Sequence, residues 1–252
     1  MKNISVLRAT AGAFLAVALQ AQVGHPPMPG HFGPGMLGHS MKVVTGAPYT
    51  AQESFQFTQT LQDGNTVQRS SPGTVARDSQ GRVRVEQNFG PSEFAGNPEH
   101  SGPVIFISDP IAGYAYVLHP DKKIAVRRPF HAEDHQNSKT HRPEAEGTKR
   151  NDAERVEESL GTQTIQGVAA EGKRVTTTIA AGKIGNSAPI VTTNEVWYSQ
   201  DLQTNVLMKR NDPRMGQSTF SLTNIQRTEP NAALFQVPSD YKIEDASERH
   251  SR

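Results

Sequence analysis

The last third of the chain constrains the fold most, because short runs of alternating polar and apolar residues are separated there by turn residues. Strand-like runs begin at Ile190, Thr204 and Ser218, and turn sequences of a few residues start at Ser199 and Asp212. Runs with a period of two, joined by such short turns, pair with their neighbours in antiparallel fashion. The segment therefore predicts an antiparallel meander, and it contains no recognisable catalytic group.

The same pattern extends upstream. Phe55 and Phe57 alternate with polar neighbours, and Asp63-Gly64 is a typical hairpin turn. A further hairpin is expected from residues 162 to 179, with its turn at Ala169-Ala-Glu-Gly172. Residues 43–243 are therefore predicted to form a mainly β domain, a single strongly curved antiparallel sheet of about nine to eleven strands. Few short helices are expected, with weak helical signals only at residues 152–158 and 231–234.

Two runs are apolar at every position rather than at alternate ones. They are Val104–Ile107 and Tyr114–Leu118. In an antiparallel sheet, such continuous apolarity indicates strands that are covered on both faces. The cover could be a helix, a loop or a bound apolar ligand, or these could be ordinary core strands of a packed domain.

The N-terminus has the pattern of a secretory signal peptide. Lys2 and Arg8 form a basic region, and the apolar run Ala9–Leu19 follows it. The run is shorter than the roughly 18 to 20 residues that a membrane-spanning helix needs. Cleavage after Ala18 or after Ala21 fits the small residues there, and we place it after Ala21, so that residues 1–21 are the signal. The protein is thus predicted to be exported, to the periplasm or the extracellular space, with no transmembrane segment in the mature chain.

Three segments are predicted to contribute little to the core. Residues 22–42 form a Pro/Gly-rich flexible tail, residues from about 129 to 159 a charged excursion, and residues 244–252 a disordered polar C-terminus. The tail contains potential metal ligands, namely His25, His31, His39, Met28, Met36 and Met41. Copper capture by these residues is the alternative to a simple linker, but no rigid spacing preorganises a site.

The excursion contains His131, His135 and His141, yet it lacks the His-Glu-x-x-His pattern of a zinc helix. We therefore predict no metal site and no cofactor.

Charge and motif content narrow the function classes. Without Lys2 and Arg8 the mature chain has 24 basic and 25 acidic residues, so its formal charge is −1 and no general attraction to nucleic acid is expected. The chain has no cysteine, which excludes disulfides and cysteine nucleophiles. It also lacks a Gly-x-Ser-x-Gly elbow, a P-loop and a dinucleotide fingerprint. We therefore do not favour an enzyme, and we predict no catalytic residue.

Several motifs resemble a group of uncharacterised secreted bacterial β-rich proteins, over most of residues 43–243. They are Arg77-Asp-Ser-x-Gly-Arg82, Asp109-Pro-x-Ala-Gly, Glu158-Ser-Leu-Gly-Thr-Gln-Thr-Ile, Ile184-Gly-Asn, Trp197-Tyr-Ser-x-Asp-Leu-Gln-Thr, Asp212-Pro-Arg and Leu222-Thr-Asn-Ile. More distantly, residues 218–240 are similar to the end of lipoprotein-carrier (LolA-like) and RseB-like periplasmic domains. That resemblance implies a half-open barrel that binds acyl chains or lipoproteins. It transfers no ligand-binding residue, because no position-specific binding motif matches.

The leading hypothesis is an exported, non-enzymatic binding protein that holds an apolar or amphipathic, lipid-like ligand on the concave face of the sheet. The candidate lining residues are Phe55, Phe57, Phe106, Tyr116 and Trp197. The alternative is an interaction module of the cell envelope that docks another protein through a sheet edge or the N-terminal tail. A hydrolase without a recognisable motif is the third hypothesis. The sequence leaves open the oligomeric state and the identity of the ligand or partner.

Overall fold

The computed structural model describes residues 42–89, 102–130 and 153–247, and all of these belong to one compact unit of the chain. Twelve strands and one short 3-10 helix lie within these ranges. Their bounds are β1 Tyr49–Thr60, β2 Thr66–Arg77, β3 Val83–Phe89, β4 Gly102–Asp109, β5 Tyr114–His119, β6 Ile124–Pro129, β7 Ala153–Ile165, β8 Val168–Ile179, β9 Ile190–Ser199, β10 Thr204–Asp212, β11 Gly216–Gln226, η5 Ala232–Phe235 and β12 Lys242–Asp245.

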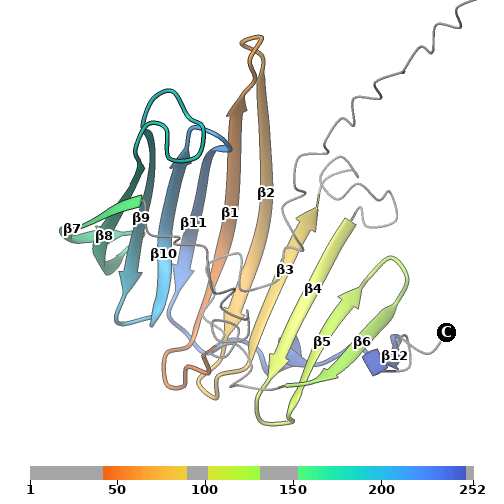
Figure 1. Cartoon of the computed structure of the whole chain (residues 1–252). Helices are drawn as coiled ribbons and strands as arrows, with labels where there is room; N and C mark the ends of the chain where they lie inside the picture. The colour runs from red at the N-terminus through yellow and green to blue at the C-terminus, as the bar shows by residue number, and fades with distance from the viewer. Residues whose placement is uncertain (1–41, 90–101, 131–152, 248–252) are drawn as a thin grey trace, which may run out of the picture. The chain divides into compact units, whose positions relative to one another are not determined.

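All twelve strands form one open sheet in the order β12-β6-β5-β4-β3-β2-β1-β11-β10-β9-β8-β7 (Figure 1). Every neighbouring pair is antiparallel except β12 and β6, which are parallel. The prediction of a mainly β chain with a single curved antiparallel sheet and few helices is confirmed. The strand number exceeds the predicted range by one.

The weak helical signal at residues 152–158 was wrong, because residues 153–158 lie in β7. Each of them pairs with a residue of β8, whose segment Val175–Ile179 is rich in β-branched side chains. Cross-strand pairing with such residues outweighs the moderate helix propensity of Glu and Arg. The helical signal near residues 231–234 corresponds to η5, which Asn231 caps by accepting a hydrogen bond from the Ala233 amide.

The β7–β8 hairpin turns at Gln166-Gly167, three residues before the predicted turn. Both residues have positive φ, 50° and 81°, which suits a two-residue hairpin turn. The predicted turn residue Gly172 instead lies inside β8, opposite Trp197. A Cβ atom at Gly172 would lie 2.6 Å from the Trp197 ring, so this glycine is needed for close packing rather than for a turn.

The strand registers divide the sheet into two faces. We call the face of β1 that carries Tyr49, Ala51, Phe55 and Phe57 the inner face, and the opposite one the outer face. Residues directly opposite each other on neighbouring strands share a face. One apolar row of the inner face can thus be followed from β1 to β6 through Ala51, Val75, Val85, Phe106, Val117 and Val126.

The outer face of β4–β6 is covered by residues 227–245, which we call the C-terminal strap. Outward-pointing Ile105, Ile107, Leu118 and Ala125 form a core cluster there, and Val237 and Tyr241 of the strap pack against it. Charged contacts tie the strap to the sheet. These contacts are Arg127 to Asp245 at 2.8 Å, Lys123 to Asp240 at 2.9 Å, and the Arg82 guanidinium 5.1 Å from the centre of the Phe235 ring.

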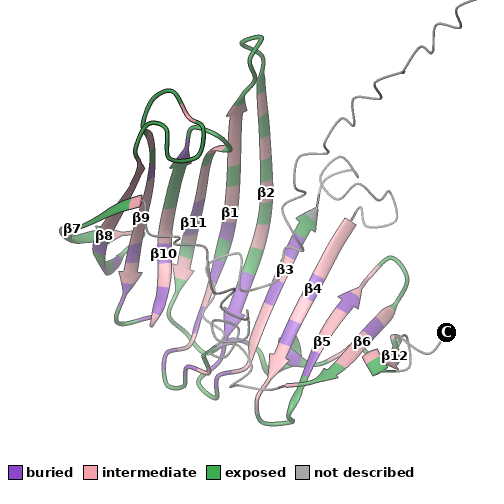
Figure 2. Ribbon diagram, viewed as in Figure 1, coloured by how far each residue is buried: buried purple, intermediate pink, exposed green. Residues whose placement is uncertain are grey.

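The larger core cluster includes Tyr49, Ala51, Val75 and Val85 of the inner face, close to Arg77. Figure 2 shows that buried residues gather where β1 begins and β2 ends, whereas the tip of the β1–β2 hairpin is exposed. The buried Arg77 side chain donates to the Ala47 carbonyl at 2.8 Å and to the Leu202 carbonyl. Its guanidinium lies 4.8 Å from the centre of the Tyr49 ring.

Arg77 belongs to β2, while Leu202 lies in the turn between β9 and β10. On a flat sheet β2 and β10 would be about 14 Å apart, three strand spacings, which is too far for one arginine side chain. The Tyr49 hydroxyl also contacts the Thr204 side chain, across the intervening β11. The sheet is therefore concave on its inner face at this end.

Burial shifts the pKa of both the Tyr49 hydroxyl and the Arg77 guanidinium. It raises the pKa of Tyr49 to about 12 and lowers the pKa of Arg77 from its ordinary value.

The β10–β11 turn is organised by one buried carboxylate. Asp212 is fully buried, and it accepts hydrogen bonds from the Arg214 amide and from both the Nε and Nη2 atoms of Arg214, at 2.9–3.0 Å. Arg210 approaches the same carboxylate at 3.4 Å. The Arg214 hydrogen bonds hold the pKa of Asp212 down at about 2, against an ordinary 3.8.

We expect Arg77→Met to lower the free energy of unfolding by about 2–4 kcal/mol, because two buried carbonyls lose their donor. Arg77→Lys should have an intermediate effect, since an ammonium cannot serve both acceptors with the same geometry. Urea denaturation measures both. Arg227→Met is the matched control, since Arg227 is exposed and pairs with the equally exposed Asp201. Equal stability of Arg77→Met and the control would contradict this role.

Asp212→Asn is expected to cost about 1–2 kcal/mol at pH 7, because charge-assisted hydrogen bonds from two arginines are weakened. The pKa of Asp212 is depressed in the folded state, so its contribution is complete above its ordinary pKa of 3.8 and is lost as the pH falls through about 2. The stability difference between wild type and variant should therefore close between pH 4 and pH 2. A difference that does not change with pH would argue against an ionised Asp212.

Candidate functional site

The inner face of β4–β6 is apolar and only half covered. Val104, Phe106, Val117 and Val126 point to this face and are each of intermediate burial. Among the described elements, β3–β6 pack mainly against their neighbouring strands and, for β3 and β4, against η5. Because η5 lies on the outer face beside Arg82 and Arg84, the strap covers the outer side of these strands, and no described helix packs on their inner side.

A second apolar row lies further along the inner face, in the other half of the sheet. Val196, Met208, Phe220 and Phe55 are directly opposite one another on β9, β10, β11 and β1, and we call them the aromatic row. On the outer face the next positions of the same strands are Glu195, Lys209, Thr219 and Gln56. Such a contrast is typical of a sheet with one apolar and one solvated face.

A polar pair interrupts the inner face between the two apolar rows. Glu53 and Gln87 are both 3% exposed and lie on either side of Gly73. The Gln87 amide nitrogen donates to a Glu53 carboxylate oxygen at 3.5 Å, while Gln87 Oε1 is buried with no hydrogen-bond partner among the described residues. A buried acceptor without a partner costs about 1–3 kcal/mol, so a donor group placed there would be stabilised.

The structure brings together three of the five predicted lining residues. Phe55, Phe57 and Phe106 all point to the inner face. Tyr116 points to the outer face instead, where it packs against the cluster under the strap. Trp197 follows Val196 of the aromatic row and therefore points away from that row. It is 3% exposed within the main core.

Other residues of the inner face escaped the sequence reasoning, chiefly Val104, Val117, Val126, Met208 and Phe220. The sequence shows that Val104–Ile107 and Tyr114–Leu118 are apolar at every position, but it does not show their register. Phe106 lies opposite Val117 rather than Tyr116, and this one-residue offset decides which face each side chain occupies.

The outer face of β7–β11 bears a chain of ion pairs. Arg174 lies between Glu158 and Glu195, at 3.3 and 3.1 Å, and Lys209 is 3.8 Å from Glu195. The Trp197 indole N–H donates to Glu195 at 2.8 Å, and this bond together with Arg174 lowers the pKa of Glu195. An open groove of about 570 Å³ lies over these residues and their Thr, Asn and Gln neighbours. Its polar lining is what a solvated sheet face presents.

Other site types find no support in the part of the chain that the structure describes. It contains no group of three or more His, Cys, Asp or Glu side chains placed to hold a metal ion. No helix within it is long and apolar enough to cross a bilayer. The His/Met-rich tail and the histidines at 131, 135 and 141 lie outside the described residues.

No protein-family model matches the chain, and no curated protein matches it by sequence. A comparison with solved structures finds several that are similar to it at low sequence identity. An uncharacterised conserved protein from Thermus thermophilus is 10% identical, with a TM-score of 0.41 over 79% of this chain and 90% of that one. A chain of the Pseudomonas aeruginosa MucA/MucB complex is 9% identical, with a TM-score of 0.39 over 79% of this chain and 58% of that one.

A LolA-superfamily protein from Nitrosomonas europaea is 8% identical, with a TM-score of 0.32 over 79% of this chain and 92% of that one. Its class is the one that residues 218–240 distantly resemble. Likeness at this level carries no ligand, partner or compartment from one chain to another, so the function has to be argued from the residues themselves.

Gly172→Ala is expected to destabilise the protein by about 1–3 kcal/mol, because the added methyl overlaps the Trp197 ring. Trp197 is the sole tryptophan, so its fluorescence emission should shift as the ring is displaced. Adding Trp197→Phe should recover part of the loss, which circular dichroism during unfolding can measure. If Gly172→Ala leaves both stability and emission unchanged, this close packing is wrong.

Proposed function

We propose that the protein is an exported, non-enzymatic binding protein that holds an apolar or amphipathic ligand on the inner face of its sheet. The observation that carries the proposal is the unequal cover of β4–β6. These strands are apolar on both faces, and the chain's own strap covers only the outer one. The question of what covers these strands therefore concerns the inner face alone, where no described helix packs against them.

The apolar area still exposed there is large enough to matter energetically. Complete burial of a Val or Phe side chain is worth about 1.5–3 kcal/mol. Val104, Phe106, Val117 and Val126 are half buried, so covering them would contribute roughly 3–6 kcal/mol before the costs of association. An alkyl chain lying along the concave face can supply that cover, and the aromatic row extends the surface that it contacts.

The main alternative is that a partner protein adds a strand at an edge of the sheet. The residues of the two edge strands make such pairing unfavourable. β7 is a long edge strand, but Glu154, Arg155, Glu157 and Glu158 make it strongly charged. The other edge, β12, has only four residues, three of them charged. Charged or very short edge strands are the usual protection against pairing with other chains. An apolar ligand on the inner face therefore fits the residues better than a docked strand.

The proposal that the protein is exported rests on residues 1–21. Their basic region and short apolar run have the pattern of a signal peptide. An exported carrier meets lipids and other amphiphiles of the envelope, which agrees with an apolar binding face. We propose the periplasm or the extracellular space as the compartment. Fractionation of cells that express the full chain, combined with N-terminal sequencing of the mature protein, tests this assignment.

Lipid mass spectrometry of the protein purified from an envelope fraction, together with uptake of a fluorescent fatty acid, tests the binding proposal. Val117→Thr with Val126→Thr puts two hydroxyls on the inner face at nearly constant volume, and uptake should weaken about tenfold. Val156→Thr is the matched control, because Val156 is exposed on β7 and belongs to an outer-face row. Absence of both an extracted lipid and any uptake would overturn the proposal, and equal uptake by all three proteins would place the ligand elsewhere.

A further inference from the structure

We propose that Gln87 Oε1 receives the head group of the ligand on the inner face, and that this head is an uncharged hydrogen-bond donor. The ligand class is then a lipid with a hydroxyl head, such as a long-chain alcohol or a monoacylglycerol. The inference rests on the proposed function and adds the head group to it. Its basis is the polar pair of the inner face, in which Glu53, Gly73 and Gln87 are directly opposite one another on β1, β2 and β3.

The side-chain amide of Gln87 presents an unused acceptor. Gln87 is 3% exposed, and its Oε1 atom has no hydrogen-bond partner among the described residues. Its Nε2 atom donates to a Glu53 carboxylate oxygen at 3.5 Å. This contact fixes the orientation of the amide, because the reverse orientation would place Oε1 against the carboxylate. A buried acceptor of this kind is stabilised by any donor that reaches it.

Gly73 lies between the two polar side chains, in the interior of β2. A Cβ atom there would be 2.6 Å from the Glu86 carbonyl oxygen, and 3.5 Å from both Gln87 Cγ and the Glu53 carboxylate. Because Gly73 has no side chain, Glu53 and Gln87 meet above β2, although β1 and β3 are two strand spacings apart, about 10 Å. A glycine inside a strand often marks a place that another group approaches closely.

An uncharged donor suits this acceptor best. An ionised carboxylate, an ester and an ether can only accept hydrogen bonds, so none of them can pair with Gln87 Oε1. An ammonium can donate, but it would carry a charge from water onto a covered face between apolar rows, which is costly. A hydroxyl donates one hydrogen bond and has no charge. It therefore satisfies the acceptor at the lowest cost of desolvation.

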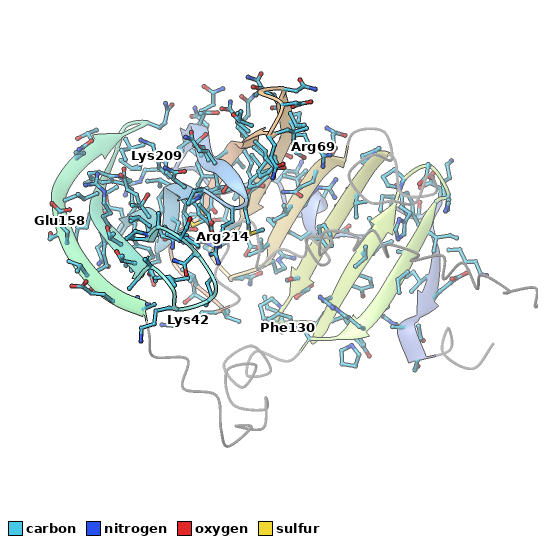
Figure 3. All side chains as sticks on the ribbon, turned by 45° about the horizontal axis from the view of Figure 1, so that its top comes forward. Lys42, Arg69, Phe130, Glu158, Lys209 and Arg214 are labelled. Carbon is cyan, nitrogen blue, oxygen red and sulfur yellow. The ribbon has the colours of Figure 1, made fainter. Side chains whose placement is uncertain are left out.

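The apolar surface for the ligand chain begins beside this acceptor. On β4, Val104 is directly opposite Gln87, and Phe106 follows two residues further along, about 7 Å away. Both are half buried and belong to the proposed binding surface. Arg69, labelled in Figure 3, lies four residues along β2 from Gly73, about 14 Å toward the hairpin tip. A chain that starts at Gln87 can therefore run along Val104 and Phe106 over apolar side chains.

The alternative is that an ordered water donates to Gln87 Oε1 and that the polar pair serves only the packing of β1–β3. The two accounts differ in one measurable respect. A permanent water predicts that affinity does not depend on the head group of the ligand, whereas a head-group site predicts a preference for donors.

Binding of dodecanol, of its isomer undecyl methyl ether and of dodecanoic acid to the full mature chain at pH 7 distinguishes the two. The ether has the same atoms as the alcohol but no donor, and the ionised acid has no donor either. We expect the alcohol to bind about ten- to a hundredfold more tightly than the ether or the acid. The other two still bind through their chains. Equal affinity for alcohol and ether would overturn the head-group site while leaving the apolar site intact, and failure of all three to bind would overturn the proposed function itself.

Gln87→Leu removes the acceptor at similar volume, and it should bring the ratio of the alcohol and ether affinities close to one. The ratio compares two ligands on the same protein, so a partly unfolded fraction does not change it. Gln56→Leu is the matched control, because Gln56 is exposed on the outer face of the neighbouring strand β1 and should keep the wild-type ratio. A wild-type ratio in Gln87→Leu would contradict the assignment of the head group to Gln87. The wild-type comparison of the three ligands decides the proposal even if Gln87→Leu does not fold.

Discussion

The hydrogen bonds of one buried arginine join parts of the chain that the strand ladder alone would keep apart. Arg77 of β2 donates to the carbonyls of Ala47 and Leu202, and the second of these belongs to the β9–β10 turn. Its positive charge is removed from water, so the two carbonyls and the Tyr49 ring have to replace that hydration. This requirement holds the turn over the end of the inner face, and the sheet becomes concave there.

Concavity and the C-terminal strap together produce the asymmetry on which the proposed function depends. The strap crosses from β11 to the far edge, where β12 pairs with β6, and it buries the outward side chains of β4–β6 on its way. The inner side chains of the same strands gain no such cover from the described elements. One apolar face is thus used for stability, whereas the proposed function assigns the other to a ligand.

The sequence predicted the class of fold because local patterns determine it. Alternation in runs such as the one from Ser218, and turns such as Asp63-Gly64, need no tertiary information. The site was only partly predictable, because a lining residue is defined by register between strands that are distant in sequence. Phe55 and Phe57 share a face by their own spacing, whereas the separation of Phe106 from Tyr116 depends on the offset between β4 and β5. The role of Gly172 likewise depends on its partner Trp197, 25 positions away by their numbering.

The central claim is that a ligand contacts the inner face and not the outer one. Photo-crosslinking with a diazirine-bearing fatty acid, followed by peptide mapping of the adducts, tests it most directly. The account predicts adducts at inner-face positions such as Phe106, Val117 and Met208, and far fewer in the outer-face groove beside Arg174 and Lys209. Adducts concentrated in that groove or under the C-terminal strap would contradict it.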